Sequence, residues 1–65
     1  MTEAEIIRRA KELIKRADKR IYETVEAIKG SNLADVNKIR WEVIRTAQEG
    51  KAISQQILKE LGAKP

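Results

Sequence analysis

The sequence predicts an all-α protein: an antiparallel two-helix hairpin that assembles with other copies into a multi-chain helical bundle. Three observations support this fold class. The chain of 65 residues combines 42% hydrophobic with 37% charged residues and contains no Phe and only three Gly, which is typical of helices rather than sheets. Isoleucine recurs every seven residues in the first half, and a single helix-breaking segment lies near the middle.

The length and the missing residue types limit how this chain is stabilised. Residues 1–65 leave room for one helical domain, and so short a chain buries only about 60% of its unfolded surface. Without Cys or His, the sequence predicts no disulfide, no zinc site of the usual ligands, no thiol nucleophile and no imidazole base. Good helix packing and association with further chains remain as sources of stability.

The first predicted helix covers about residues 3–29. Thr2-Glu3-Ala4-Glu5 forms a capping box, in which the Thr2 side chain accepts from the Glu5 amide and the Glu5 side chain reaches back. Lys29 is followed by Gly30, the residue favoured at the left-handed position just after a helix.

A turn at residues 30–32 and a second helix at about 33–61 follow. Ser31 or Asn32 is expected to cap this helix, and Gly62 to end it. So short a connection makes the two helices antiparallel neighbours. Gly50 leaves an alternative open, a three-helix bundle broken at that residue. Nearly equal arms favour the hairpin.

Apolar residues of the first helix follow a heptad pattern and occupy an arc of roughly 120° at about 100° per residue. One groove can cover such a stripe. The predicted hairpin seam consists of Ile7, Ala10, Leu13, Ile14, Ala17, Ile21, Val25 and Ile28.

The second helix has a much broader face. Its charged residues are confined to roughly 100°, which leaves an arc of over about 200° that one partner helix cannot bury. Trp41 is either an anchor of an interface or packed on its own hairpin, and Arg40 and Lys51 have no evident partner on this face. The predicted oligomer interface comprises Val36, Asn37, Arg40, Trp41, Val43, Ile44, Ala47, Gln48, Gly50, Ser54, Gln55, Ile57, Leu58 and Leu61.

These features together resemble de novo designed helical-hairpin homo-oligomers. The resemblance covers the whole chain and rests on the Thr2–Glu5 opening, the Gly30-Ser31-Asn32 loop, the isoleucine heptads, and Asn37, Gln48, Ser54 and Gln55 among apolar positions. It implies an outer amphipathic helix that supports an inner helix with a broader contact face, and buried polar groups that specify partner and register. Gly50, Arg40 and Lys51 depart from the idealised pattern.

The sequence therefore predicts a non-catalytic structural protein whose partner is itself, in a cyclic homo-oligomer with or without a central lumen. No catalytic constellation, cofactor site, metal site or small-molecule site is evident. Residues 1–30 contain eight Lys/Arg and six Asp/Glu, and residues 31–65 contain six Lys/Arg and four Asp/Glu. Neither half is a basic arm, so the sequence does not predict binding to nucleic acid or to a membrane. Without a signal or targeting segment, a soluble, unsecreted chain is expected. The alternative is a small monomeric helical module that binds a separate protein target.

Overall fold

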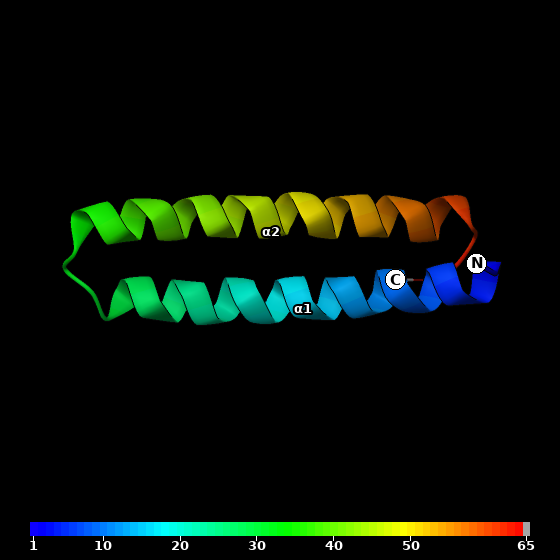
Figure 1. Cartoon of the computed structure of the whole chain (residues 1–65), viewed down its shortest axis with the longest axis horizontal. Helices are drawn as coiled ribbons and strands as arrows, with labels where there is room; N and C mark the ends of the chain where they lie inside the picture. Colours follow the sequence, from blue (N-terminus) through cyan, green and yellow to red (C-terminus); the bar gives the residue numbers. More distant parts are fainter. Residues whose placement is uncertain (65) are drawn as a thin grey trace.

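The computed structural model describes residues 1–64 and is an antiparallel hairpin of two helices (Figure 1). Helix α1 spans Glu3–Lys29 and helix α2 spans Ala34–Glu60. The two helices lie side by side, and the start of α1 and the end of α2 both lie at the end of the hairpin away from the turn (Figure 1). The predicted all-α hairpin is confirmed.

Helix α1 begins with the expected cap and ends differently from the prediction. The Thr2 hydroxyl accepts a hydrogen bond from the Glu5 amide at 3.2 Å, which satisfies one of the free N–H groups of the first turn. At the other end Gly30 has a φ of −92°, so the predicted left-handed conformation is wrong. Its N–H instead donates to the Glu26 carbonyl at 3.2 Å, which continues the helical pattern by one residue.

The turn is held by Ser31 in a way that the sequence did not predict. Leu33, rather than Ser31 or Asn32, occupies the N-cap of α2, and no side chain caps that helix. The Ser31 hydroxyl accepts from the Leu33 amide at 3.1 Å, and the Asn37 side-chain amide donates to the Ser31 carbonyl at 3.2 Å. These two bonds tie the turn to the first turn of α2, so the hairpin reverses direction over few residues.

Helix α2 is continuous through Gly50, which excludes the three-helix alternative. Within residues 1–64 only Gly62 has a positive φ, at 71°. The Ala63 amide donates to the Leu58 carbonyl at 2.9 Å, and the Gly62 amide donates to the Lys59 carbonyl at 3.1 Å. This is the Schellman arrangement, in which glycine adopts the left-handed conformation without a steric penalty. The end of α2 is therefore specified by its own local sequence.

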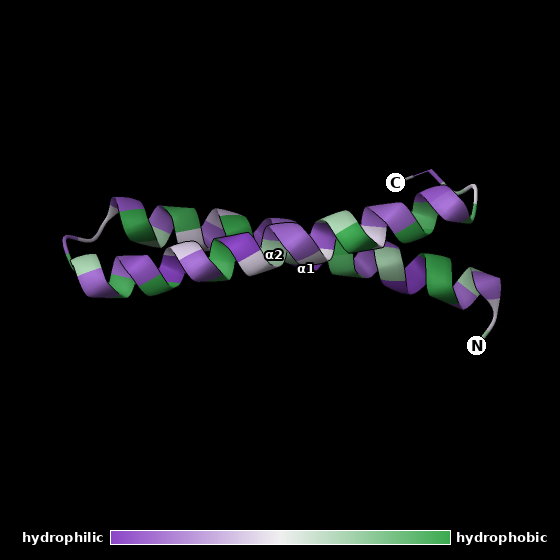
Figure 2. Ribbon diagram, turned by 90° about the horizontal axis from the view of Figure 1, so that it is seen from above, coloured by the Kyte–Doolittle hydropathy of each residue, from purple (hydrophilic) through white to green (hydrophobic). Residues whose placement is uncertain are grey.

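The hairpin is long and thin, measuring 45 × 18 × 14 Å. Figure 2 shows that the helices cross at a shallow angle and that apolar and polar residues alternate along both ribbons. Only Ala10, Ile44, Ser54 and Leu58 are buried among residues 1–64. Neither helix of this described part is long and apolar enough to cross a membrane. A single hairpin thus has a very small core for its length.

Candidate interaction surface

One face of α2 packs against α1, and we call it the inner seam. Its members are spaced alternately by three and four residues, as in a coiled coil. All of them are buried or half-buried: Asn37, Arg40, Ile44, Ala47, Lys51, Ser54 and Leu58.

Several residues of the predicted oligomer interface lie in this inner seam. Ile44 and Ser54 are almost completely buried and Leu58 is completely buried within the single chain. Their side chains have almost no surface left for a second chain, so the structure places them in the hairpin's own core. Ala47 and Leu61 are half-buried beside them.

The two cations that the sequence left without partners both have one. The Lys51 ammonium lies 2.6 Å from an Asp18 carboxylate oxygen on α1, and the Arg40 guanidinium donates to the Asn37 side-chain oxygen at 2.9 Å. The sequence offered no evident partner for them on the broad face, and the structure supplies one within the same chain for each. These contacts place polar groups along one side of the contact between the helices. The Asn37 side chain makes its hydrogen bonds within its own chain.

The predicted seam of α1 largely faces α2. Ala10 is buried, and Ile7, Ile14, Ala17, Ile21, Val25 and Ile28 are half-buried. Leu13 differs, because 52% of it is exposed. It lies at the edge of the seam, on the side away from the Asp18–Lys51 ion pair.

A second face of α2 lies open to solvent, and we call it the outer seam. It also has the alternating spacing of three and four residues, which is the spacing of a coiled-coil contact. Ile39 and Ile53 are 66% and 63% exposed, although isoleucine is among the residues most often found inside proteins. The outer seam consists of Val36, Ile39, Val43, Thr46, Gly50, Ile53 and Ile57.

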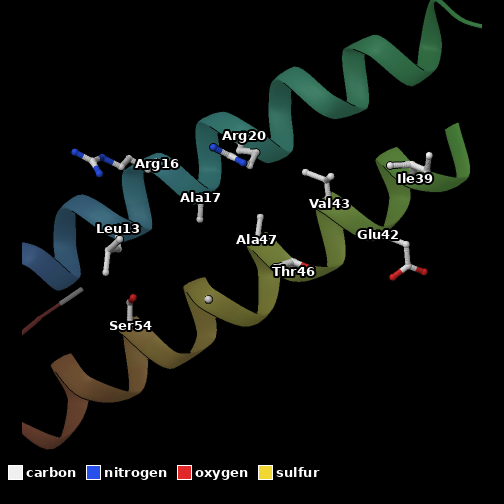
Figure 3. Close-up of a pocket in the computed structure, with 11 residues that line it drawn as sticks. Leu13, Arg16, Ala17, Arg20, Ile39, Glu42, Val43, Thr46, Ala47 and Ser54 are labelled. Atoms are coloured by element: carbon white, nitrogen blue, oxygen red, sulfur yellow. The ribbon is translucent and has the colours of Figure 1, made fainter. Parts of the chain in front are cut away.

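The outer seam and the edge of α1 together form an open groove (Figure 3). Leu13 and Ala17 reach toward it from α1, and Val43, Ala47 and Ser54 from α2 (Figure 3). Gly50 leaves a gap in its floor, since a Cβ added there would meet no atom within 4 Å. The groove is lined by Leu13, Arg16, Ala17, Arg20, Ile39, Glu42, Val43, Thr46, Ala47, Gly50 and Ser54.

The two rims of the groove carry opposite charges. Arg16 and Arg20 stand on the α1 side, and Glu42 stands on the α2 side, where it points away from α1 (Figure 3). We call Arg16 and Arg20 the basic rim. Glu49 lies seven residues beyond Glu42 and hence on nearly the same face of α2. These two glutamates form the acidic rim.

The basic rim has no partner of its own within residues 1–64, and the acidic rim has only a weak one. Neither Arg16 nor Arg20 is in an ion pair there, and nor is Glu42. Glu49 lies 3.7 Å from Arg45, with both side chains about 70% exposed, and such surface pairs contribute little stability. Both rims can therefore accept a charged partner from outside the chain.

The opposite side of the hairpin is more polar. Trp41 and Tyr22 are 56% and 68% exposed there, and Gln48 and Gln55 are exposed as well. This side also carries the Asp18–Lys51 ion pair. Trp41, Gln48 and Gln55 thus lie apart from the outer seam, although the sequence grouped them with it.

The sequence-based site omitted two of its most exposed aliphatic residues, Ile39 and Ile53, and the charged rims. The alternating spacing from Val36 to Ile57 could have identified the two isoleucines. Assigning α2 one broad face, instead of two seams of heptad spacing, hid that signal.

This surface is suited to contact through apolar side chains. No group of three or more acidic residues within residues 1–64 could hold a metal ion. No family model matches the chain, and no significant match was found among curated proteins or solved structures. The exposed hydrophobic residues suggest a binding partner that contacts the groove.

Proposed function

We propose that this protein is a non-catalytic structural module that self-assembles into a cyclic homo-oligomeric helical bundle. The outer seam carries the proposal, because a face with coiled-coil spacing and two isoleucines more than 60% exposed lacks the helical partner that such a face normally has. Burying that face removes apolar surface from water, at roughly 25 cal/mol per Å².

The small core of the hairpin supports the same proposal. Four buried residues among residues 1–64 are few for a chain that has neither a disulfide nor a zinc site of the usual ligands, and association is the usual remedy for scaffolds of this size. Homo-oligomers are mostly closed and cyclic. A two-fold pair or another compact small ring buries the outer seam without a lumen, whereas a large ring leaves a central channel.

The experiment is a mass measurement by light scattering at micromolar concentration. We expect a multiple of the 7.4 kDa chain mass. A mass of one chain at every concentration would contradict the proposal, and would favour a monomeric module that uses the groove for a separate protein target.

A matched pair of variants links the mass to the outer seam. Ile53→Glu places a carboxylate in the seam and lowers the net charge by one. Lys38→Glu places a carboxylate at an exposed position outside the seam and lowers the net charge by two, so it changes the overall charge more than the seam variant does. A carboxylate buried without a partner costs several kcal/mol, so Ile53→Glu should yield monomers. Lys38→Glu should leave the mass unchanged. Equal effects would mean that the interface lies elsewhere.

A further inference from the structure

We infer that the groove is filled by the same groove of a second copy, related by a two-fold axis parallel to the helices, so that α1 of each chain lies against α2 of the other. This inference rests on the proposed self-assembly and specifies its geometry. The result is a compact four-helix bundle in which the turns of both hairpins lie at the same end.

The two sides of the hairpin favour a groove-to-groove contact over a head-to-tail ring. The groove side exposes Ile39, Ile53 and Leu13, whereas the opposite side is closed by the Asp18–Lys51 ion pair at 2.6 Å. A head-to-tail ring would cover the aliphatic groove with a side on which the exposed Trp41 and Tyr22 stand among polar groups. A two-fold contact instead pairs each apolar groove with an identical one.

Charge then selects between the two possible two-fold arrangements. With the axis perpendicular to the helices and along the α1-to-α2 direction, α1 meets α1 and α2 meets α2, so each rim faces its own charge. With the axis parallel to the helices, the basic rim of one chain faces the acidic rim of the other. Like charges brought together at an interface are costly, so the second arrangement is favoured.

The register of the hairpin identifies one particular pair. Lys51 reaches Asp18 across the antiparallel hairpin, so these residues lie at nearly the same height. Two residues onward along α1 is Arg20, and two residues back along α2 is Glu49. An axis parallel to the helices preserves height. Arg20 of one copy therefore lies level with Glu49 of the other, and the symmetry creates this pair twice.

Gly50 provides independent support for a close approach at that level. It follows Glu49 directly, and a Cβ there would meet nothing within 4 Å inside the hairpin. Glycine within a helix is less stable than alanine, so the hairpin by itself gains nothing from it. The open space beside Glu49 accommodates the stem of an incoming arginine.

Charge reversal tests the pairing. Arg20→Glu and Glu49→Arg should each weaken association at least about tenfold, since each introduces two like-charge contacts in a dimer. An equimolar mixture of the two variants should recover wild-type association, because both contacts become opposite in charge across chains although each chain alone carries like charges. If each single charge-reversal variant associates as tightly as the wild type, the inference is overturned.

The position of the turns gives a second readout that does not depend on charge. The chain has no Cys, so Asn32→Cys at the exposed turn accepts one spin label. We expect a label separation of about 10–20 Å, one to two interhelical distances, whereas turns at opposite ends would give about the 45 Å length of the hairpin.

Mass and label distance separate the two proposals. A monomer would refute self-assembly itself. A dimer with distant labels, or an assembly larger than a dimer, would refute only this geometry. A dimer with close labels and rescue in the mixture supports both.

Discussion

The two helices of this hairpin have the same length. They differ in how much of their apolar surface is covered within the chain. Helix α1 half-buries its heptad isoleucines on α2, and Leu13 and Tyr22 are its only large hydrophobic residues that stay exposed. Helix α2 has two seams, of which α1 covers one. Pairing within the chain therefore covers the apolar stripe of α1 but leaves α2 with a second contact face, on which the proposed function rests.

The largest effect is expected where α2 is already covered. Leu58 is completely buried, whereas its neighbour Ile57 is 38% exposed. Leu58→Ala should reduce the free energy of unfolding by about 2–5 kcal/mol, which includes the cost of a cavity. Ile57→Ala should cost less. Denaturant unfolding of both variants in an Ile53→Glu background, which is expected to be monomeric, compares the two within a single hairpin. An equal or larger loss from Ile57→Ala in that background would reverse our assignment of the seams.

A smaller effect is expected at Gly50, where only the outer seam is affected. Gly50→Ala should stabilise the isolated helix by about 0.5–1 kcal/mol, because the new methyl group meets no neighbour in the hairpin. Gly50→Leu should leave helicity intact but weaken association by about 1–3 kcal/mol through overpacking.

Ala52→Leu is the control for Gly50→Leu, since Ala52 is exposed two residues further along α2 and outside both seams. Sedimentation of the variants measures association, and circular dichroism measures helicity. Unchanged association of Gly50→Leu would remove Gly50 from the contact.

The smallest effect is expected at the ion pair that closes the polar side. The Lys51 and Asp18 side chains are 33% and 53% exposed, and pairs so open to solvent contribute about 1 kcal/mol or less. Asp18→Asn should therefore lower the free energy of unfolding by no more than that amount. The difference should shrink at high salt, where the charges are screened. A loss that is larger and independent of salt would indicate a role other than ion pairing.

Local signals in the sequence predicted the two helices well. They predicted some helix ends correctly and others incorrectly. The Thr2 cap could be predicted because its partner, the Glu5 amide, is three residues away. The backbone conformation of Gly30 and the hydrogen bonds of Ser31 could not be predicted, because the shape of the turn depends on how the two helices dock. The Schellman end at Gly62 has all its partners within five residues, and it was located correctly.

The interaction surface was predictable only in part, because helical periodicity does not say which apolar seam the partner helix will cover. Ile44 and Ile39 are both isoleucines on α2, yet Ile44 is 4% exposed and Ile39 is 66% exposed. The Asp18–Lys51 pair joins residues 33 positions apart, beyond any local pattern. Which side of α2 remains open therefore becomes visible only once the two helices are packed, with Ile44, Ser54 and Leu58 buried on the covered side.

Whether another copy of this chain covers the outer seam can be measured by the thermal unfolding of the wild-type protein across a hundredfold range of concentration. If folding and association are coupled, mass action requires Tm to rise with protein concentration. We predict such a rise, and its loss in Ile53→Glu. A Tm that stays constant over the whole range would show that the hairpin is stable alone with its outer seam open, and would contradict self-assembly through that seam.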